Sequence, residues 1–358
     1  MKNFSLIASL LLLQTFDCIE IRLTRYEYSQ HEHNAYVGAV SVGKPGQDFN
    51  VEFDLQSSVL WVPDCDLATD HAKKKYCINK NTFDTKASET YSNGTAPISF
   101  PFMKGDVAAY TAHDTFRPGP HYKPGTSAKN FIFATAYQFP ASYPSLKHDG
   151  VFGLSPTPVD GMDVPIRQLL DRNAITEPII TIFLMTPNKN NMFDGLITLG
   201  GLDRSHCERP TAYVRVEIEE GWVFSAPKFT IDGIPKQDVG YTVTIDQSTD
   251  FFYVPDKVLN LIVTQTGDHG IDAETGRYIV DKRSLPITFS STHFEVSIDS
   301  SQLYDPYPKN ANYRLLRVGV TGPAAKTSFV LGTPFFSKHC VVLNYEGRMA
   351  FPKKIGVQ

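Results

Sequence analysis

The chain lacks the motifs that mark several large classes of enzyme. It contains no Gly-x-Ser-x-Gly elbow, no His-Glu-x-x-His zinc motif and no glycine-rich phosphate loop, which sets aside the corresponding hydrolases, metallopeptidases and nucleotide-binding enzymes. Its cysteines and histidines also lack the spacing of metal ligands. We therefore expect no metal and no other cofactor.

Positive charge and long hydrophobic runs are scarce as well. The net charge is -4, and the only dense basic run, Lys73–Lys75, is predicted to be a solvated loop, so nucleic-acid binding is not expected. One short apolar run, Phe4–Leu13, follows Lys2 and indicates a signal peptide within residues 1–18, for export or delivery to lysosomes. No later run approaches 18 apolar residues, so no membrane span is expected.

The cysteines are few but even in number after the signal peptide. Besides Cys18, the chain has Cys65, Cys77, Cys207 and Cys340. In a secreted protein this set predicts two disulfides, and three pairings are open. The short loop between Cys65 and Cys77 favours that pair, which leaves Cys207 with Cys340.

Two further polar features have simple interpretations. Asn93 begins an Asn-Gly-Thr sequence in a turn-like setting, which is an acceptor for N-glycosylation in a secreted protein. The cluster His31-Glu32-His33 falls near the N-terminus of the mature chain, where we expect a flexible, solvated segment.

The 358 residues are enough for two domains or one bilobed unit, and their pattern is mostly that of strands. Short alternating apolar runs recur between Gly, Pro, Asn and Asp, and aromatic residues are abundant. Helical spacing is clearest over Val164–Arg172 and Pro255–Thr264.

A weak internal repeat links the two halves of the chain. Residues 52–58 and 244–250 each carry an apolar strand, an aspartate and a hydroxyl residue three positions later, and an apolar-apolar-Gly segment follows each of them. The matching members are Asp54, Ser57 and Gly153 in the first half and Asp246, Thr249 and Gly332 in the second. Two lobes facing each other would bring the two aspartates together.

With this repeat, the chain resembles the pepsin family of aspartic proteases from about Tyr36 to Lys353. The segments that carry the resemblance occur in the order of the family: "AYVGAVSVGKPGQDFNVEFD", "SSVLWVPDC", "DGVFGLSP", "GLITLGGLD" and "FVLGTPFFSKHCVVLNYEGRMAFPK". The resemblance implies a mostly-β fold of two pseudo-symmetric lobes with a peptide cleft between them.

The same resemblance implies a division of the chain and a type of partner. Residues 35–209 would form the N-terminal lobe and residues 210–358 the C-terminal lobe, after a short N-terminal or vestigial pro-segment at 19–34. The expected protein is a monomer with a peptide or protein in its cleft.

The chemistry of the family depends on two close carboxyl groups that share one proton. One of them activates a water molecule while the other protonates the carbonyl oxygen of the peptide. The resemblance assigns these roles to Asp54 and Asp246. It also implies that Ser57 and Thr249 support the pair with hydrogen bonds.

The residues between these positions depart from the Asp-Thr-Gly motif of the family. Leu55 has no hydroxyl group for the hydrogen bond between the lobes, and Gln247 could not make the same bond as threonine. Gln56 and Ser248 place side chains where the family has glycine. If the glycine conformation is kept, each would cost on the order of 1 kcal/mol.

The flap of the family has changed too. Phe102 stands at the position of its tyrosine, which would leave Trp61 without its usual hydrogen-bond partner, and Gly105 is the glycine that remains. These departures favour a catalytically impaired or inactive homologue that keeps its peptide-binding cleft. The alternative is an active acid endopeptidase with Asp54 and Asp246 as the dyad.

Overall fold

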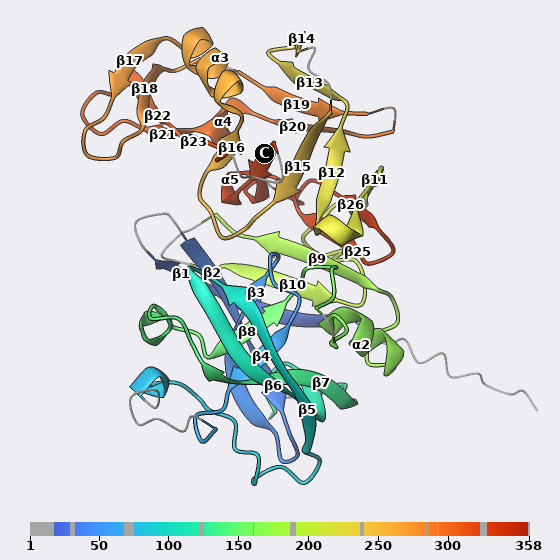
Figure 1. The fold of residues 1–358 in the computed structure, drawn as a ribbon. Helices are drawn as coiled ribbons and strands as arrows, with labels where there is room; N and C mark the ends of the chain where they lie inside the picture. Colours follow the sequence, from blue (N-terminus) through green and yellow to red (C-terminus); the bar gives the residue numbers. More distant parts are fainter. Residues whose placement is uncertain are drawn as a thin grey trace, which may run out of the picture.

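The computed structural model describes residues 18–28, 33–67, 75–121, 125–159, 161–186, 191–236, 240–283, 285–291, 293–322 and 328–356. Strands dominate, and Figure 1 shows two β-rich lobes, one from the first half of the chain and one from the second. The mostly-β, bilobal fold is thus confirmed. Most of the predicted signal peptide, His31, Glu32, Lys73 and Lys74 lie outside the described residues. Within the described ranges, no helix has the length and apolar character needed to cross a membrane.

A sheet of 13 strands joins the two ends of the chain. In spatial order its strands are β11 (Val214–Arg215), β26 (Arg348–Ala350), β25 (Val341–Asn344), β9 (Ile179–Leu184), β10 (Gly195–Leu199), β1 (Ile19–Tyr28), β2 (His33–Val42), β3 (Gln47–Asp54), β8 (Gly150–Gly153), β4 (Leu60–Pro63), β7 (Ala128–Gln138), β6 (Gly105–Pro118) and β5 (Ser92–Phe102). The segment considered as a vestigial pro-segment therefore contains a strand, β1, in the middle of this sheet.

Three smaller sheets form the rest of the second half. They consist of β12 (Val223–Ala226), β15 (Tyr241–Ile245), β24 (Phe329–Leu331), β16 (Phe252–Val254) and β23 (Val318–Val320); of β14 (Ile234–Lys236), β13 (Lys228–Ile231), β19 (Ile287–Ser290) and β20 (Glu295–Ile298); and of β17 (Asp268–Ile271), β18 (Tyr278–Asp281), β22 (Tyr313–Leu316) and β21 (Tyr304–Pro306).

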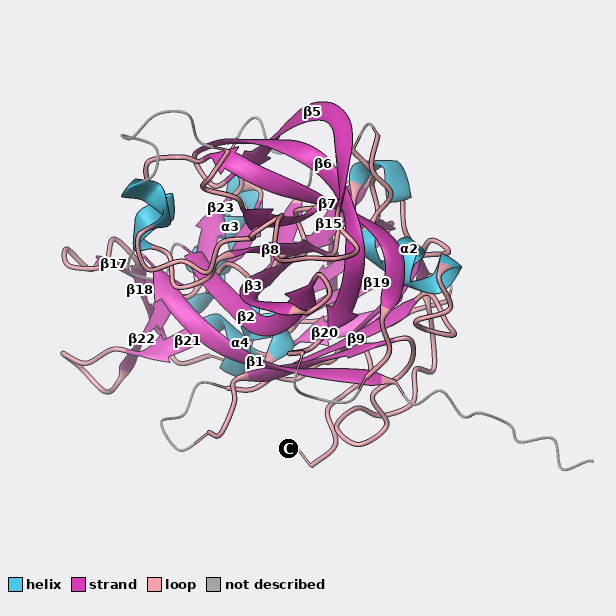
Figure 2. Ribbon diagram, turned by 90° about the horizontal axis from the view of Figure 1, so that it is seen from below, coloured by secondary structure: helices cyan, strands magenta, loops and turns pink. Residues whose placement is uncertain are grey.

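Helices are short and few beside the strands (Figure 2). They are α2 (Pro165–Asp171), α3 (Asp256–Thr266), α4 (Ser300–Leu303) and α5 (Thr333–Phe336), with 3-10 turns η1 (Lys75–Cys77), η2 (Tyr143–Ser145) and η3 (Ile218–Glu220). The two helices predicted from spacing are confirmed as α2 and α3. Each has an apolar face that packs into the core.

The internal repeat is present in the strand pairing. In the first half β3 runs parallel to β8 while β4 pairs antiparallel with β8; in the second half β15, β16 and β24 are related in the same way. A Cβ atom on Gly153 would lie 2.4 Å from the backbone nitrogen of Val59, and one on Gly332 would lie 2.3 Å from the carbonyl oxygen of Phe251. Both glycines thus let a strand end close against an aspartate loop.

Both predicted disulfides are present, Cys65–Cys77 and Cys207–Cys340. Asn93 is exposed, as a glycan acceptor must be, and its Oδ1 accepts a hydrogen bond from Tyr91. Its predicted turn-like setting is wrong, because Asn93 lies in β5, at an irregularity of the pairing with β6. Gly94 has no side chain there, which lets the strand approach the carbonyl of Thr111 closely.

The expectation of a flexible, solvated tail at His33 is also wrong. This residue begins β2 and pairs with Tyr28 of β1. Its side chain is only 22% exposed and lies 3.2 Å from the carboxylate of Glu52. A buried acidic partner therefore holds a histidine that looks, in the sequence, like part of a polar tail.

Candidate active site

The two aspartates occupy equivalent ends of equivalent strands. Asp54 is the last residue of β3, and Asp246 follows the last residue of β15. Asp54 Oδ1 accepts a hydrogen bond from the backbone N–H of Gln56 at 2.9 Å, and Asp246 Oδ1 accepts one from Ser248 at 2.8 Å. Each carboxylate is thus held by the backbone two residues further along, which fixes its orientation in the same way in both loops.

The residues at the two glycine positions are not strained. Neither Gln56 nor Ser248 has a positive φ. The conformational cost expected if these residues kept a left-handed glycine conformation therefore does not arise. Because the backbone N–H groups still reach the carboxylates, the substitutions have not opened the loops around Asp54 and Asp246.

Hydrogen bonds between the lobes are present despite the lost threonines. Gln247 Nε2 donates to the carbonyl oxygen of Phe53 at 2.8 Å, and Gln56 Nε2 donates to the carbonyl oxygen of Ile245 at 3.2 Å. Each amide therefore reaches the residue just before the opposite aspartate. Leu55 has no hydroxyl group and makes no such bond, and the amide of Gln56 links the first loop to the other lobe instead. The side chain of Leu55 is buried in the core instead.

The two hydroxyl residues stabilise the loops rather than the carboxylates. Ser57 Oγ accepts the N–H of Val59 at 3.4 Å, and Thr249 Oγ1 accepts the N–H of Phe251 at 3.2 Å. In the described part of the chain, these hydroxyl groups make no hydrogen bond to either aspartate. The predicted supporting role of Ser57 and Thr249 is therefore not present in this arrangement.

Both carboxyl groups are shifted toward the protonated form. Burial raises the pKa of Asp54 to about 7, and the negative charge of Glu52 adds to the shift. Burial also raises the pKa of Asp246, although hydrogen bonds from Ser248 oppose this. The protonated form is consequently favoured at both aspartates relative to an exposed aspartate.

A polar network not predicted from the sequence anchors the second loop. The carbonyl oxygen of Ser248 accepts the backbone N–H of Asn34 at 2.6 Å. The amide oxygen of Asn34 accepts a hydrogen bond from Arg25 at 2.6 Å, and Arg25 also contacts Asp250 at 2.8 Å. Asp250 in turn accepts a hydrogen bond from Thr333 at 2.6 Å. Strands β1 and β2 therefore hold a loop of the other lobe.

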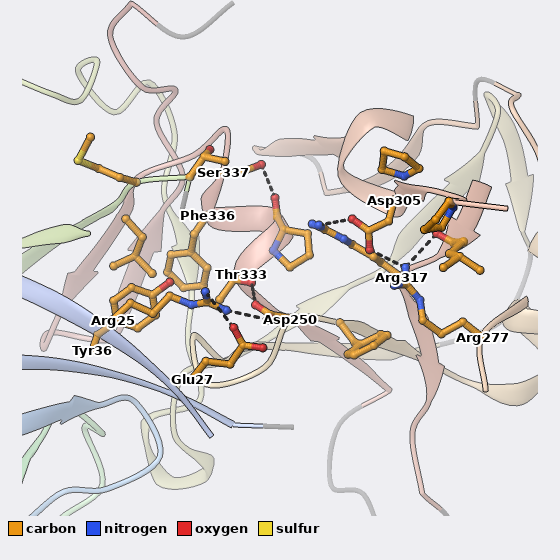
Figure 3. Close-up of a pocket in the computed structure, with 18 residues that line it drawn as sticks. Arg25, Glu27, Tyr36, Asp250, Arg277, Asp305, Arg317, Thr333, Phe336 and Ser337 are labelled. Atoms are coloured by element: carbon orange, nitrogen blue, oxygen red, sulfur yellow. Dashed lines mark hydrogen bonds and ion pairs between the residues drawn. The ribbon is translucent and has the colours of Figure 1, made fainter. Parts of the chain in front are cut away.

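Arg25, Asp250 and Thr333 of this network line a cavity of about 420 Å³, shown in Figure 3. Arg25 and Asp250 meet on one side of it, while Arg277 and Arg317 flank Asp305 on the other. The charges are thus paired within the wall of the cavity. Nothing in the sequence indicated that Arg25 would contact Asp250.

The expected flap is the hairpin of β5 and β6. Phe102 is 6% exposed, and its ring packs edge-on against Trp61 with centroids 5.3 Å apart. Trp61 Nε1 is buried and has no hydrogen-bond partner among the described residues, as expected from the loss of the tyrosine hydroxyl. A Cβ atom on Gly105 would lie 2.9 Å from Pro140, so this glycine serves close packing.

In the ranges that the structure describes, no group of three or more His, Cys, Asp or Glu side chains is arranged to hold a metal ion. The carboxyl groups of Asp54 and Asp246 can act as an acid–base pair, provided that one member is ionised and the other protonated.

The sequence matches a known protein family over most of its length. The model of the eukaryotic aspartyl protease family matches residues 35–350. The chain is similar to gastricsin of Macaca fuscata fuscata, with 27% identity over 275 residues that cover 73% of this chain and 67% of gastricsin. It is also similar to aspartic protease 6 of Caenorhabditis elegans (26% over 332 residues; 88% and 80% of the two chains) and to a probable vacuolar protease A of Trichophyton verrucosum (27% over 264 residues; 71% and 62%).

Proposed function

Because this chain belongs to the eukaryotic aspartyl protease family, we propose that it binds extended peptides between its lobes and hydrolyses them poorly, or not at all, in acid solution. The proposal separates two properties that usually occur together. Peptide binding needs two lobes held in a fixed relative position, whereas hydrolysis also needs one ionised and one protonated carboxyl group.

The observation that carries the proposal is the charge environment of the dyad. The pKa of Asp54 is raised to about 7 by burial and by Glu52, and the pKa of Asp246 is raised as well. Asp54 is then protonated between pH 3 and 5 and cannot act as the general base for water there, and the raised pKa of Asp246 makes that group a less available base as well. The absence of a hydroxyl group on Phe102 removes a further polar contact near the site.

A specific observation favours the alternative of an active acid endopeptidase. The amides of Gln247 and Gln56 join the two aspartate loops, and both carboxylates keep a backbone hydrogen bond. A dyad held this well could share a single proton with an ordinary acidic pKa for one member. This alternative predicts strong cleavage of peptides at pH 3 to 4.

Binding and cleavage measured on the same preparation separate the two functions. A statine-type inhibitor and a denatured haemoglobin digest would be titrated calorimetrically at pH 4 and pH 7, with Asp163→Asn as an exposed control. The proposal predicts saturable binding with little cleavage at pH 4. It is wrong if neither ligand binds, and the alternative holds if cleavage at pH 4 is fast and is lost in Asp54→Asn.

We also propose that the chain is a secreted or lysosomal monomer with its lobe boundary near residue 209. The apolar run Phe4–Leu13 supports entry into the secretory pathway, and two disulfides suit an oxidising compartment. Asn93 is proposed as a glycosylation site. Mass spectrometry of the secreted protein before and after removal of N-glycans tests secretion and the glycan on Asn93.

A further inference from the structure

A buried cluster of His33, Glu52 and His148 lies next to the first aspartate loop. His33 Nε2 is 3.2 Å from one carboxylate oxygen of Glu52, and His148 Nε2 is 3.3 Å from the other. The side chain of Glu52 is 1% exposed, and that of His148 is fully buried. A carboxylate this deep is costly unless charged partners compensate it, so the cluster requires an explanation.

Strand geometry places Glu52 beside the dyad. Alternate residues of a strand share one face, so Glu52 lies on the same face of β3 as Asp54, about 7 Å away along the strand. The neighbours Val51 and Phe53 point to the opposite face and pack in the main core. A charge on Glu52 therefore acts on Asp54 at short range through protein rather than through water.

Other ionisable groups face the cluster from several parts of the chain. Tyr28 of β1 stacks on His33 with ring centroids 6.1 Å apart. Lys80 Nζ donates to the carbonyl oxygen of His148 at 2.8 Å, and Asp149 is bound by the backbone N–H and side chain of Asn81. Asp246, from the second lobe, also acts on His33. Glu52 is thus the one acid that both histidines contact.

The two histidines are not equivalent. His148 Nδ1 lies 2.9 Å from the carbonyl oxygen of Gly150 and so carries a hydrogen there, which leaves Nε2 of the uncharged ring as an acceptor that cannot bond an ionised Glu52. Burial lowers the pKa of His148. Burial alone would also lower the pKa of His33, but the contact with Glu52 outweighs it and raises that pKa. His33 is therefore the histidine that supplies the positive charge.

We propose that Glu52 is a positioning residue whose charge opposes the ionisation of Asp54, with His33 as its counter-charge. This inference rests on the proposed function, because it gives a cause for the poor hydrolysis proposed in acid solution at the same site. A protonated His33 offsets the charge of Glu52 and helps Asp54 to ionise. When His33 loses its proton, the uncompensated charge opposes that ionisation.

The cluster also contacts the flap. The ring of Phe102 packs edge-on against His148, with centroids 6.1 Å apart, as well as against Trp61. An uncharged His148 suits this apolar contact. Because burial lowers the pKa of His148, we expect His33 and not His148 to control Asp54.

The experiment is a titration of the aspartate side chains by ¹³C NMR on the full-length mature protein labelled in the aspartate carboxyl carbon. Asp54→Asn assigns the signal. Glu52→Gln should lower the midpoint of Asp54 by about one pH unit or more, because an ionised neighbour at this distance has an effect of that order. His33→Gln should shift the same midpoint in the opposite direction, and His148→Gln should change it least.

Opposite shifts of the Asp54 midpoint in Glu52→Gln and His33→Gln distinguish an electrostatic role from structural damage. Structural damage would shift the midpoint in the same direction in both variants. Glu89→Gln, at an exposed glutamate that pairs with Lys44, is the matched control and should leave the midpoint unchanged. An Asp54 midpoint that does not respond to Glu52→Gln in a folded variant overturns the inference. An unresponsive midpoint would overturn only the role of Glu52, because inhibitor binding would be unchanged. If the proposed function is wrong, the inhibitor does not bind, while the aspartate midpoints still shift as expected.

Discussion

The loops that carry Asp54 and Asp246 have the same backbone architecture but different electrostatic surroundings. Each follows a strand paired in parallel with an equivalent partner, and each carboxylate accepts the N–H two residues ahead. Two residues before the aspartate, however, the first lobe has Glu52 and the second has Thr244, whose hydroxyl binds the carbonyl of Trp222 at 3.1 Å. A duplicated scaffold can thus hold two like groups in like positions while their charges are tuned separately.

Among the changes considered, removal of either carboxyl group should have the largest effect, which is on the rate of peptide hydrolysis. Asp54→Asn and Asp246→Asn should each reduce any hydrolysis measured at pH 7 at least about a hundredfold, because each removes a member of the acid–base pair. Initial rates on a fluorogenic peptide library provide the measurement. A variant that keeps wild-type rates would show that its aspartate takes no part in the reaction.

The raised pKa of Asp54 should also appear in the pH dependence of stability. Its folded-state pKa of about 7 lies above the ordinary value of 3.8, so folding retains a proton that the unfolded chain releases. This contribution is complete below pH 3.8 and is lost as the pH rises to about 7. The raised pKa of His33 acts in the same direction.

Accordingly, the stability of the wild type relative to Asp54→Asn should fall by on the order of 4 kcal/mol between pH 4 and pH 8. Urea unfolding at several pH values measures this difference. If the difference stays constant with pH, Asp54 has an ordinary pKa and the proposed charge environment is wrong.

The two glutamines that link the lobes should differ in importance. Gln247 is 2% exposed, so Gln247→Ala leaves the carbonyl of Phe53 buried without its donor and should cost about 1–2 kcal/mol. Gln56 is exposed, and water can replace its amide, so Gln56→Ala should cost about 0.5 kcal/mol. Denaturant midpoints compare them directly, and equal losses would show that burial does not distinguish these two bonds.

The smallest effect is expected at the hydroxyl residue of the first loop. Ser57 makes one long hydrogen bond within its own loop, so Ser57→Ala should change the free energy of unfolding by less than about 0.5 kcal/mol. The Asp54 midpoint should also stay in place. A large shift of that midpoint would restore the supporting role that the sequence suggested for Ser57.

The fold was predictable because its signals are local and repeated. Alternating apolar residues indicate the strands, and the two aspartate segments with their glycines indicate the duplicated lobes. The amide bonds of Gln56 and Gln247 were not predictable, since they depend on how far a side chain reaches across an interface between distant segments.

The buried cluster was only partly visible in the sequence. Polar residues alternate along β3, and Glu52 falls in that series directly before Asp54. A series of this kind is typical of a solvated face, and nothing local shows that His33 and His148 cover this glutamate. Burial of a polar face is decided by tertiary packing, which single-strand periodicity does not report.

The most direct test of the central claim is the pH profile of peptide hydrolysis from pH 3 to pH 8, with the wild type beside Asp54→Asn and with inhibitor binding followed in parallel. We expect the inhibitor to bind without Asp54-dependent cleavage below pH 5. Any weak cleavage should appear only as the pH approaches 7. Rapid cleavage at pH 3 to 4 that is blocked by the inhibitor and lost in Asp54→Asn would contradict it.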